Sequence, residues 1–493
     1  MKYDVIVVGG GPGGSVAGMT AASRGLRTLV LERAARPGDK NVSGTGLSPK
    51  CFRDFEFMRR MELPHMRKAD MASVHLVDKN NKEKVAVTFS PSDDAGYAEA
   101  REFLTVNVYR SELDPWLSGL AVQAGADLLC GAKVTDLTRS RNGKITGVVT
   151  DDGRRFSGDI IIGADGVIST VARASGIREK WAPSEVAQII NIDYGSDAGT
   201  IDASIGSNAL HYWYAATFPV GYSFFSAEGF HVGLGCYLDW WKKNPQYYLR
   251  RMLEVDGVQR QIKLAGGRPR EFQNHLVTFL TRPKKTYTDS VMLIGDAAGF
   301  ACPYEAEGVY YAMMSGRIAA TVASDAISRG DLSEGSLSEY EKTWWASPIG
   351  EEFIGGDSIE GFVRRIGFNP DAAAWITPLF NEVLFGLCNV ADSHTNNARK
   401  LPGRILKYLP ELADALKDDM GPLAIAIDNP PKKGPSKAVS YVLRKTMPFL
   451  LRLLAKVSAS STNRYNSVTT PLVMEHFLKP YVQEKLKKEA QKR

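Results

Sequence analysis

The feature that most constrains this chain is a glycine-rich turn between a short apolar strand and a helix. The turn follows a predicted strand at Asp4–Val8 and precedes a predicted helix at Ser15–Arg24. Its glycines match G-x-G-x-x-G at Gly9, Gly11 and Gly14. Such a turn lets the backbone approach a pyrophosphate that lies at the helix N-terminus. The pattern predicts a parallel βαβ unit that binds a dinucleotide, the alternative being a glycine-rich turn without a ligand.

A carboxylate follows the second strand of this unit. Thr28–Leu31 is the predicted strand, and Glu32 comes directly after it, 18 residues beyond Gly14. A carboxylate at this place accepts hydrogen bonds from a ribose and disfavours a 2′-phosphate. The dinucleotide is therefore predicted not to be NADP.

Three later sequence motifs indicate whether the bound dinucleotide is NAD or FAD. Arg110 begins an R-x-x-L-D pattern at the start of a helix predicted over Ser111–Ala124. Residues 163–173 read G-A-D-G-x-x-S-x-x-x-R, and residues 295–299 read G-D-A-A-G. The sequence contains no second strand–glycine–helix pattern of the kind that binds a nicotinamide dinucleotide. Electrons are therefore expected from a protein donor, or from a nicotinamide cofactor that binds transiently without a dedicated Rossmann domain.

With these four motifs in this order over residues 4–316, the chain resembles the FAD-dependent oxidoreductases of the glutathione-reductase-like superfamily. The branch is the one with the para-hydroxybenzoate-hydroxylase fold. The resemblance implies an α/β fold, in which an FAD-binding Rossmann domain carries an inserted β-sheet substrate domain and a helical C-terminal region. It also implies FAD as the cofactor. The residues expected to contact FAD are Gly9, Gly11, Pro12, Gly13, Gly14, Glu32, Arg33, Lys40, Ser43, Gly44, Arg110, Asp165, Gly166, Gly295, Asp296 and Gly308.

The resemblance assigns roles to three of these side chains. Asp296 would hydrogen-bond the ribitol of FAD, Arg110 would lie near the ribitol and pyrophosphate, and Asp165 would line the same groove. Each has an alternative interpretation without a cofactor. Asp296 could cap a helix N-terminus, Arg110 could form a surface ion pair, and Asp165 could stabilise a turn.

The same pattern divides the chain into segments. The stretch between about 184 and 280 is rich in aromatic residues, valine and glycine with period-2 patches, which predicts a sheet. The predicted segments are an FAD-binding domain over 1–183 (with inserted sheet strands at about 70–105) and 281–330, a β-sheet substrate domain over 184–280, a helical C-terminal region over 331–430, and a basic amphipathic tail over 431–493.

Within the superfamily the chain is most similar to the geranylgeranyl reductase family and its FixC-type relatives, which resemble electron-transfer-flavoprotein:quinone oxidoreductases. Residues 37–44 are similar to the FixC-type loop, and residues 303–309 to the P-x-x-x-E-G form of geranylgeranyl reductases. Two departures limit the transfer of roles. Val42-Ser43 stand where several archaeal geranylgeranyl reductases carry a cysteine, and the clustered cysteines of an iron–sulfur centre are absent.

The resemblance implies hydride transfer from reduced FAD to a carbon–carbon double bond, with a proton supplied at the neighbouring carbon. The acid–base candidates follow the third motif closely and are Tyr304, Glu305 and Glu307. Positioning of the backbone near the flavin accounts for Glu307 equally well. The candidates for substrate binding are His211, Trp213, Tyr214 and Phe218, with Phe224, Phe225 and Phe230 as further parts of an apolar wall. The alternative for this aromatic set is an ordinary sheet core.

The charge of the chain is concentrated in its tail. The net charge is +6, and residues 431–493 alone carry 14 Lys and Arg against 3 Asp and Glu, so the remainder is net acidic. The whole protein is therefore not predicted to bind nucleic acid. Lys437–Lys456 reads as an amphipathic helix with a basic face. This helix could contact a membrane surface, dock on the enzyme itself, or bind an acidic electron carrier.

The spacing of the cysteines and histidines argues against a metal-binding site. The five cysteines form no C-x-x-C pair, and the seven histidines form no H-E-x-x-H motif.

The sequence contains no unbroken run of about 18 apolar residues, so no membrane-spanning helix is predicted. The expected location is cytoplasmic, with peripheral contact at the inner face of the membrane as an option for the basic tail.

The predicted function is an FAD-dependent oxidoreductase that reduces the double bonds of an isoprenoid lipid or lipoquinone. The alternative is FixC-like electron transfer between an electron-transfer flavoprotein or ferredoxin and quinone. An FAD monooxygenase and a flavin-bearing subunit of a larger complex are weaker alternatives. The expected partners are a lipophilic substrate and a protein electron donor such as ferredoxin or an electron-transfer flavoprotein.

Overall fold

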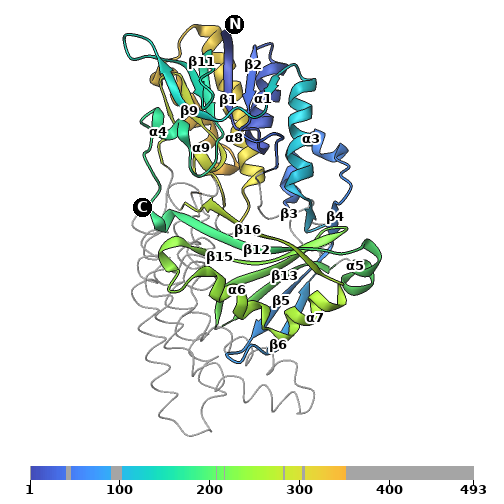
Figure 1. Ribbon diagram of the computed structural model, residues 1–493. Helices are drawn as coiled ribbons and strands as arrows, with labels where there is room; N and C mark the ends of the chain where they lie inside the picture. The colour runs from blue at the N-terminus through green and yellow to red at the C-terminus, as the bar shows by residue number, and fades with distance from the viewer. Residues whose placement is uncertain are drawn as a thin grey trace, which may run out of the picture.

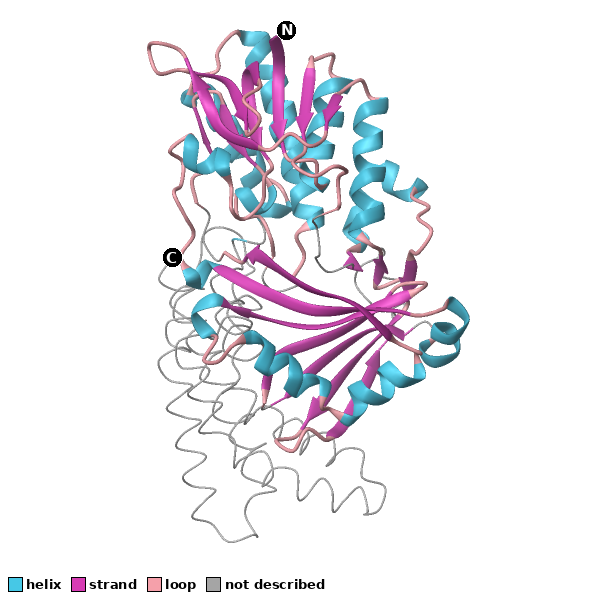
Figure 2. Ribbon diagram, viewed as in Figure 1, coloured by secondary structure: helices cyan, strands magenta, loops and turns pink. Residues whose placement is uncertain are grey.

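Two large β-sheets with helices packed on them form most of the described part of the chain (Figures 1 and 2). The computed structural model describes residues 2–39, 46–89, 103–206, 208–215, 217–280, 284–302, 306–350 and 353. Lys40, Ser43, Gly44, Tyr304, Glu305, the tail over 431–493 and most of the C-terminal region over 331–430 lie outside these residues.

The first sheet has a parallel centre. Its order is β17-β18-β11-β1-β2-β8, and β10 and β9 continue from β11 as an antiparallel ladder. The apolar run of β1 is buried between parallel neighbours on both sides, which suits a strand covered on both faces. Its strands are β1 (Lys2–Val8), β2 (Thr28–Leu31), β8 (Asp127–Leu129), β9 (Val134–Arg139), β10 (Ile145–Thr150), β11 (Arg155–Gly163), β17 (Tyr287–Thr288) and β18 (Val291–Leu293).

Small residues let the helices on this sheet approach one another closely. A Cβ at Gly316 of α8 would lie 2.3 Å from the carbonyl oxygen of Gly13 in α1, so these two backbones touch. The helix α1 begins at Pro12, earlier than the predicted Ser15, because proline is favoured at the first helical position and lacks the N–H that would be unpaired there. The longer helices of this half are α1 (Pro12–Ser23), α3 (Arg110–Gln123), α8 (Val309–Arg329) and α9 (Glu334–Trp345).

The second sheet joins distant parts of the chain. Its order is β16-β12-β15-β14-β13-β5-β6, and β13 pairs in parallel with β5, which lies more than 130 residues earlier. The helices α6 and α7 lie on the side of this sheet that faces away from α1 and α3 (Figure 1). Its strands are β5 (Met71–Val77), β6 (Glu83–Phe89), β12 (Val186–Gly195), β13 (Asn208–Ala215), β14 (Phe218–Phe225), β15 (Gly229–Tyr237) and β16 (Arg268–Thr278).

Shorter elements connect the two halves. A three-stranded sheet of order β3-β7-β4 lies between them (Figure 1). No helix within the described residues is both long and apolar enough to cross a membrane. The remaining elements are β3 (Gly46–Leu47), β4 (Arg67–Ala69), β7 (Thr105–Asn107), α2 (Pro49–Asp54), α4 (Thr170–Ala174), α5 (Ala198–Ile205), α6 (Pro245–Leu253), α7 (Asp256–Leu264), and the 3-10 turns η1 (Glu56–Arg60), η3 (Pro183–Glu185), η4 (Leu238–Trp240) and η5 (Gly295–Ala297).

Candidate functional site

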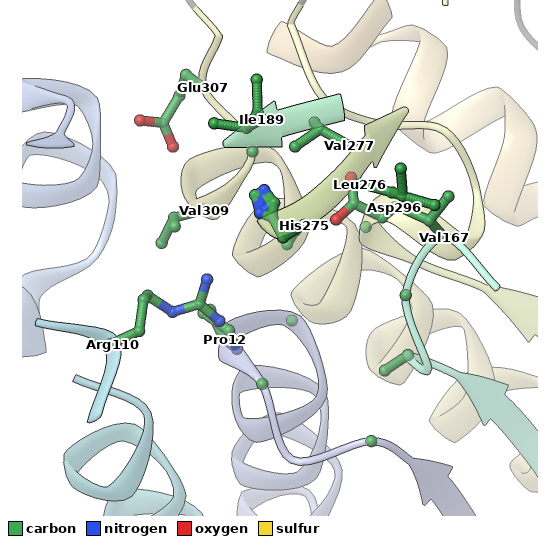
Figure 3. Close-up of a pocket in the computed structure, with 18 of the residues that line it drawn as sticks. Pro12, Arg110, Val167, Ile189, His275, Leu276, Val277, Asp296, Glu307 and Val309 are labelled. Atoms are coloured by element: carbon green, nitrogen blue, oxygen red, sulfur yellow. The ribbon is translucent and has the colours of Figure 1, made fainter. Parts of the chain in front are cut away.

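A cavity of about 1880 Å³ lies between the two halves and collects most of the residues expected to contact FAD. Figure 3 shows part of its lining, with Arg110 and Pro12 across the cavity from His275. Ligand pockets usually hold about 300–1,000 Å³, so this cavity has room for a cofactor and a second molecule. The expected cofactor contacts that line it are Gly9, Gly11, Pro12, Gly13, Gly14, Glu32, Arg33, Arg110, Asp165, Gly166, Gly295, Asp296 and Gly308.

The glycine-rich turn fits a pyrophosphate. Gly9 has φ +111°, and a Cβ on Gly14 would lie 1.9 Å from the carbonyl oxygen of Gly9, so the fold itself demands glycine at both positions. Gly11 is different, because a Cβ there would meet only the Nη2 of Arg110, at 3.8 Å. No side chain caps the N-terminus of α1 at Gly11. The open space at Gly11 and the uncapped helix N-terminus both suit an anionic ligand.

Glu32 is held in place by the backbone around it. Its carboxylate accepts hydrogen bonds from the N–H groups of Gly10 at 2.8 Å and Ala34 at 2.7 Å. The side chain is buried at the edge of the cavity. A carboxylate fixed in this way keeps lone pairs for the hydroxyls of a ribose, as expected from its position after β2.

Arg110 belongs to a buried ion pair. Its guanidinium donates to both carboxylate oxygens of Asp114, at 2.6 and 2.8 Å, and the side chain of Asp114 is fully buried. Burial opposes the charge on Arg110, but the attraction and hydrogen bonds of Asp114 raise the pKa of the guanidinium above its ordinary value. The interpretation of Arg110 as a surface ion pair is therefore wrong. A fixed cation faces the cavity instead.

The two predicted cofactor aspartates lie in different local settings. Asp296 lies in η5 and accepts a hydrogen bond from the Thr278 hydroxyl at 3.2 Å, while burial raises its pKa. Asp165 accepts from the Ser169 hydroxyl at 2.5 Å and from the Val171 N–H at 3.0 Å. Burial raises the pKa of Asp165 as well. Both aspartates line the cavity, and Asp165 also stabilises the turn before α4.

Glu307 has a structural partner. Its carboxylate accepts the N–H of Tyr310 at 2.7 Å, in the first turn of α8, and the side chain is buried. It also lines the cavity (Figure 3). This contact satisfies one of the unpaired N–H groups that begin a helix, so it fits the backbone-positioning interpretation. An acid–base role for Glu307 stays a prediction.

The predicted substrate residues lie mostly on the other face of the second sheet. Trp213 and Phe218 are fully buried in a core beneath the sheet, and Phe225 and Phe230 belong to the same core. His211 and Trp213 line a second cavity of about 250 Å³, and Tyr214 is absent from the lining of the large cavity. Side chains alternate between faces along a strand, and the sequence pattern does not indicate which face meets the cofactor.

On β13 and β14 the cavity wall consists of alternate residues that do not belong to the Trp213 and Phe225 set, and on β16 it includes consecutive residues. Of the predicted wall residues, Phe224 faces the large cavity. The rings of Tyr212 and Tyr222 pack against Phe224, with centroids 5.6 and 4.8 Å away. The apolar and aromatic residues of this wall are Ile189, Leu210, Tyr212, Val220, Tyr222, Phe224, Leu276 and Val277.

His275 is a cavity residue that the sequence patterns did not single out. It lies on β16 and lines the large cavity. Burial and the positive charge of Arg110 lower its pKa to about 4. The sequence pattern does not indicate whether a histidine in a predicted sheet faces a cavity. The position of His275 at the cavity follows from the pairing of β16 with β12.

Comparisons with known proteins identify a matching family and several similar proteins. The model of the family described as FAD binding domain matches residues 2–344. Digeranylgeranylglycerophospholipid reductase of Methanocaldococcus jannaschii is 30% identical in an alignment of 361 positions that covers 69% of this chain and 82% of that protein. Protein FixC of Azorhizobium caulinodans is 29% identical in an alignment of 361 positions that covers 69% of this chain and 80% of that protein. The crystal structure of a geranylgeranyl bacteriochlorophyll reductase-like protein from Thermoplasma acidophilum matches with a TM-score of 0.64 at 22% identity, covering 85% of this chain and 99% of that one.

Proposed function

Because this chain belongs to the FAD binding domain family, as an FAD-dependent oxidoreductase of the geranylgeranyl reductase and FixC group, we propose that it reduces carbon–carbon double bonds of a prenyl lipid or lipoquinone. The predicted cofactor, FAD, and the predicted α/β fold of the para-hydroxybenzoate-hydroxylase type are confirmed by these comparisons. When bound, FAD supplies hydride chemistry.

The observation that carries the proposal is the apolar wall opposite the FAD cradle. Tyr212, Tyr222 and Phe224 form its aromatic part, and aliphatic side chains of β12, β14 and β16 continue it. Such a wall favours a lipophilic chain over a polar substrate, since burying apolar surface contributes about 25 cal/mol per Å². The name of the archaeal relative, a reductase of a digeranylgeranyl lipid, supports the same substrate class.

Different residues of the chain are proposed to bind FAD and to position the substrate. In this proposal, the glycine turn, Glu32, Arg110 and Asp296 hold FAD. The wall of the second sheet orients the substrate and keeps water out of the cavity. The proton for the second carbon is proposed to come from Tyr304, Glu305 or Glu307.

Electron transfer to quinone is the second candidate. It is supported by the similarity to FixC, which covers the same share of this chain as the similarity to the archaeal reductase. An electron-transfer flavoprotein or ferredoxin is the proposed electron donor in both cases, since the sequence carries no second dinucleotide pattern. Contact of the basic tail with a membrane stays a prediction, because residues 431–493 lie outside the described part of the chain.

An anaerobic half-reaction tests the proposal. The holoenzyme is reduced with dithionite, a geranylgeranyl lipid or a short-chain quinone is added, and flavin absorbance is followed. We expect reoxidation by the prenyl lipid, with a saturated product by mass spectrometry. Fast reoxidation by quinone alone, with no saturated lipid, would assign the protein to electron transfer instead.

A pair of variants tests the assigned wall. Tyr212 and Tyr214 lie two residues apart on β13, but only Tyr212 lines the large cavity. We expect Tyr212→Gln to raise the KM for the lipid about tenfold, equivalent to about 1.4 kcal/mol, and Tyr214→Gln to leave it unchanged. Equal effects of the two changes would show that the wall is misassigned.

A further inference from the structure

One side chain of the second sheet reaches the cofactor side of the large cavity. His275 lies on β16, which forms the edge of that sheet. Figure 3 shows its imidazole near the middle of the cavity, with Asp296 to one side and Arg110 across from it. The same strand ends at Thr278, whose hydroxyl donates to Asp296 at 3.2 Å. The cofactor motif therefore holds this end of β16 in place.

The imidazole of His275 lacks a partner for a polar atom. Its Nε2 is sealed from solvent and makes no hydrogen bond among the described residues. His65, His75, His211 and His231 differ, because each has a hydrogen-bond or ion-pair partner. A buried polar group without a partner costs stability, so such groups are normally satisfied by protein, water or ligand. Of the described side chains with such an atom, Gln273 among them, His275 is the one that lines the large cavity. A half-turn of its ring, which exchanges Nε2 with Cε1, would let a molecule bound in the cavity supply the missing partner.

The charges around His275 favour its neutral form. Arg110 of α3 lies across the cavity from it, Asp296 of η5 lies to one side, and Glu307 of the turn before α8 lies on another part of the wall (Figure 3). Burial, followed by the positive charge of Arg110, lowers the pKa of His275 to about 4. A neutral imidazole offers one N–H donor and one nitrogen acceptor. Both kinds of group occur on the edge of a flavin ring.

We propose that His275 is a direct hydrogen-bonding contact to bound FAD, supplied by the second sheet and not by the nucleotide-binding half. The proposal rests on FAD as the cofactor and does not depend on which acceptor the enzyme reduces. Since β16 also contributes Leu276 and Val277 to the apolar wall, one strand would then contact both the flavin and the substrate.

FAD titration of the apoprotein, with no electron acceptor present, tests the proposal. Flavin fluorescence gives the Kd for His275→Leu, which removes the hydrogen bond, and His275→Gln, which keeps one. Gln273→Leu is the matched control, because Gln273 is a half-buried residue of the same strand that does not line the cavity. We expect His275→Leu to raise the Kd about tenfold, and the other two variants to stay within about threefold of wild type.

Two results would overturn the proposal. One is a folded His275→Leu protein, checked by circular dichroism, whose Kd for FAD and flavin absorption spectrum equal those of wild type. The other is an equal loss of affinity in Gln273→Leu, which would trace the effect to the strand. Failure of the anaerobic lipid assay would leave the FAD titration unchanged, so the two proposals fail separately.

Discussion

Substitution of Gly14 by alanine tests whether the start of α1 is as tightly packed as the structure shows. The added Cβ would lie 1.9 Å from the carbonyl oxygen of Gly9 and 3.2 Å from the Cβ of Ala164. A contact of 3 Å requires α1 to move by about 1 Å, and the obstacle is backbone that cannot rotate away. Overpacking of this kind costs about 3 kcal/mol, near the upper end of the usual range.

In the proposed site, the same movement displaces the N-terminus of α1 from the pyrophosphate of FAD. Loss of two charge-assisted hydrogen bonds, at about 1.5 kcal/mol each, weakens FAD binding more than 100-fold. We expect a fall in Tm of roughly 6 °C for Gly14→Ala, at about 2 °C per kcal/mol. Differential scanning fluorimetry of the apoprotein and FAD titration measure the two effects.

Gly119→Ala is the control for Gly14→Ala. Gly119 lies in the interior of α3, and nothing lies within 4 Å of a Cβ built there. Alanine at this helix position is expected to stabilise the protein by about 0.5–1 kcal/mol and to leave FAD affinity unchanged. If Gly14→Ala bound FAD within threefold of wild type and kept its Tm, the argument from close packing would be refuted.

Two further predictions concern ionisable side chains. Asp114→Ala removes the carboxylate that forms the buried ion pair with Arg110, so we expect a loss of about 3–5 kcal/mol in urea unfolding; a loss below about 1 kcal/mol would contradict the buried pair. His65 hydrogen-bonds Glu112 and Glu228, and the bond to Glu112 is the main reason that its pKa is raised. A raised pKa gives stability that is complete below the unfolded value of about 6.5 and disappears as pH rises through the folded pKa. The Tm difference between wild type and His65→Gln should therefore shrink from pH 6 to pH 9, and a constant difference would exclude the linkage.

Local requirements explain why the cofactor half was predictable from the sequence. Gly9, Gly14 and Glu32 act within one βαβ unit, where a turn, a close helix and a strand end follow each other within 30 residues. The strand prediction at Thr28–Leu31 is confirmed, and the predicted helix over Ser15–Arg24 differs from α1 mainly at its start. Each requirement is set by neighbours along the chain, so spacing alone identifies it.

The acid–base prediction shows where this local reasoning ends. Glu307 follows the flavin motif at a spacing that suits either catalysis or backbone positioning. Its bond to the N–H of Tyr310 depends on where α8 begins, which the sequence did not settle. Boundaries of a helix depend on its caps and its tertiary contacts, so they are the least certain part of a sequence-based prediction.

The sequence by itself determined the glycine-rich nucleotide-binding turn and the presence of an aromatic sheet. Both are visible in short segments, because the backbone conformation of the turn requires glycine and the strands show a period of two. Only the tertiary structure decided which phase of that sheet meets the cavity. Trp213 and Phe218 lie in the core beneath it, while Tyr212 and Phe224 face the cofactor half. The phase depends on β16, β12 and the remote β5 pairing in one sheet, and on helices that cover its other face. Such contacts join residues far apart in the chain. The alternation of side chains along a strand separates two faces but does not indicate which face will be covered by helices and which will line the cavity.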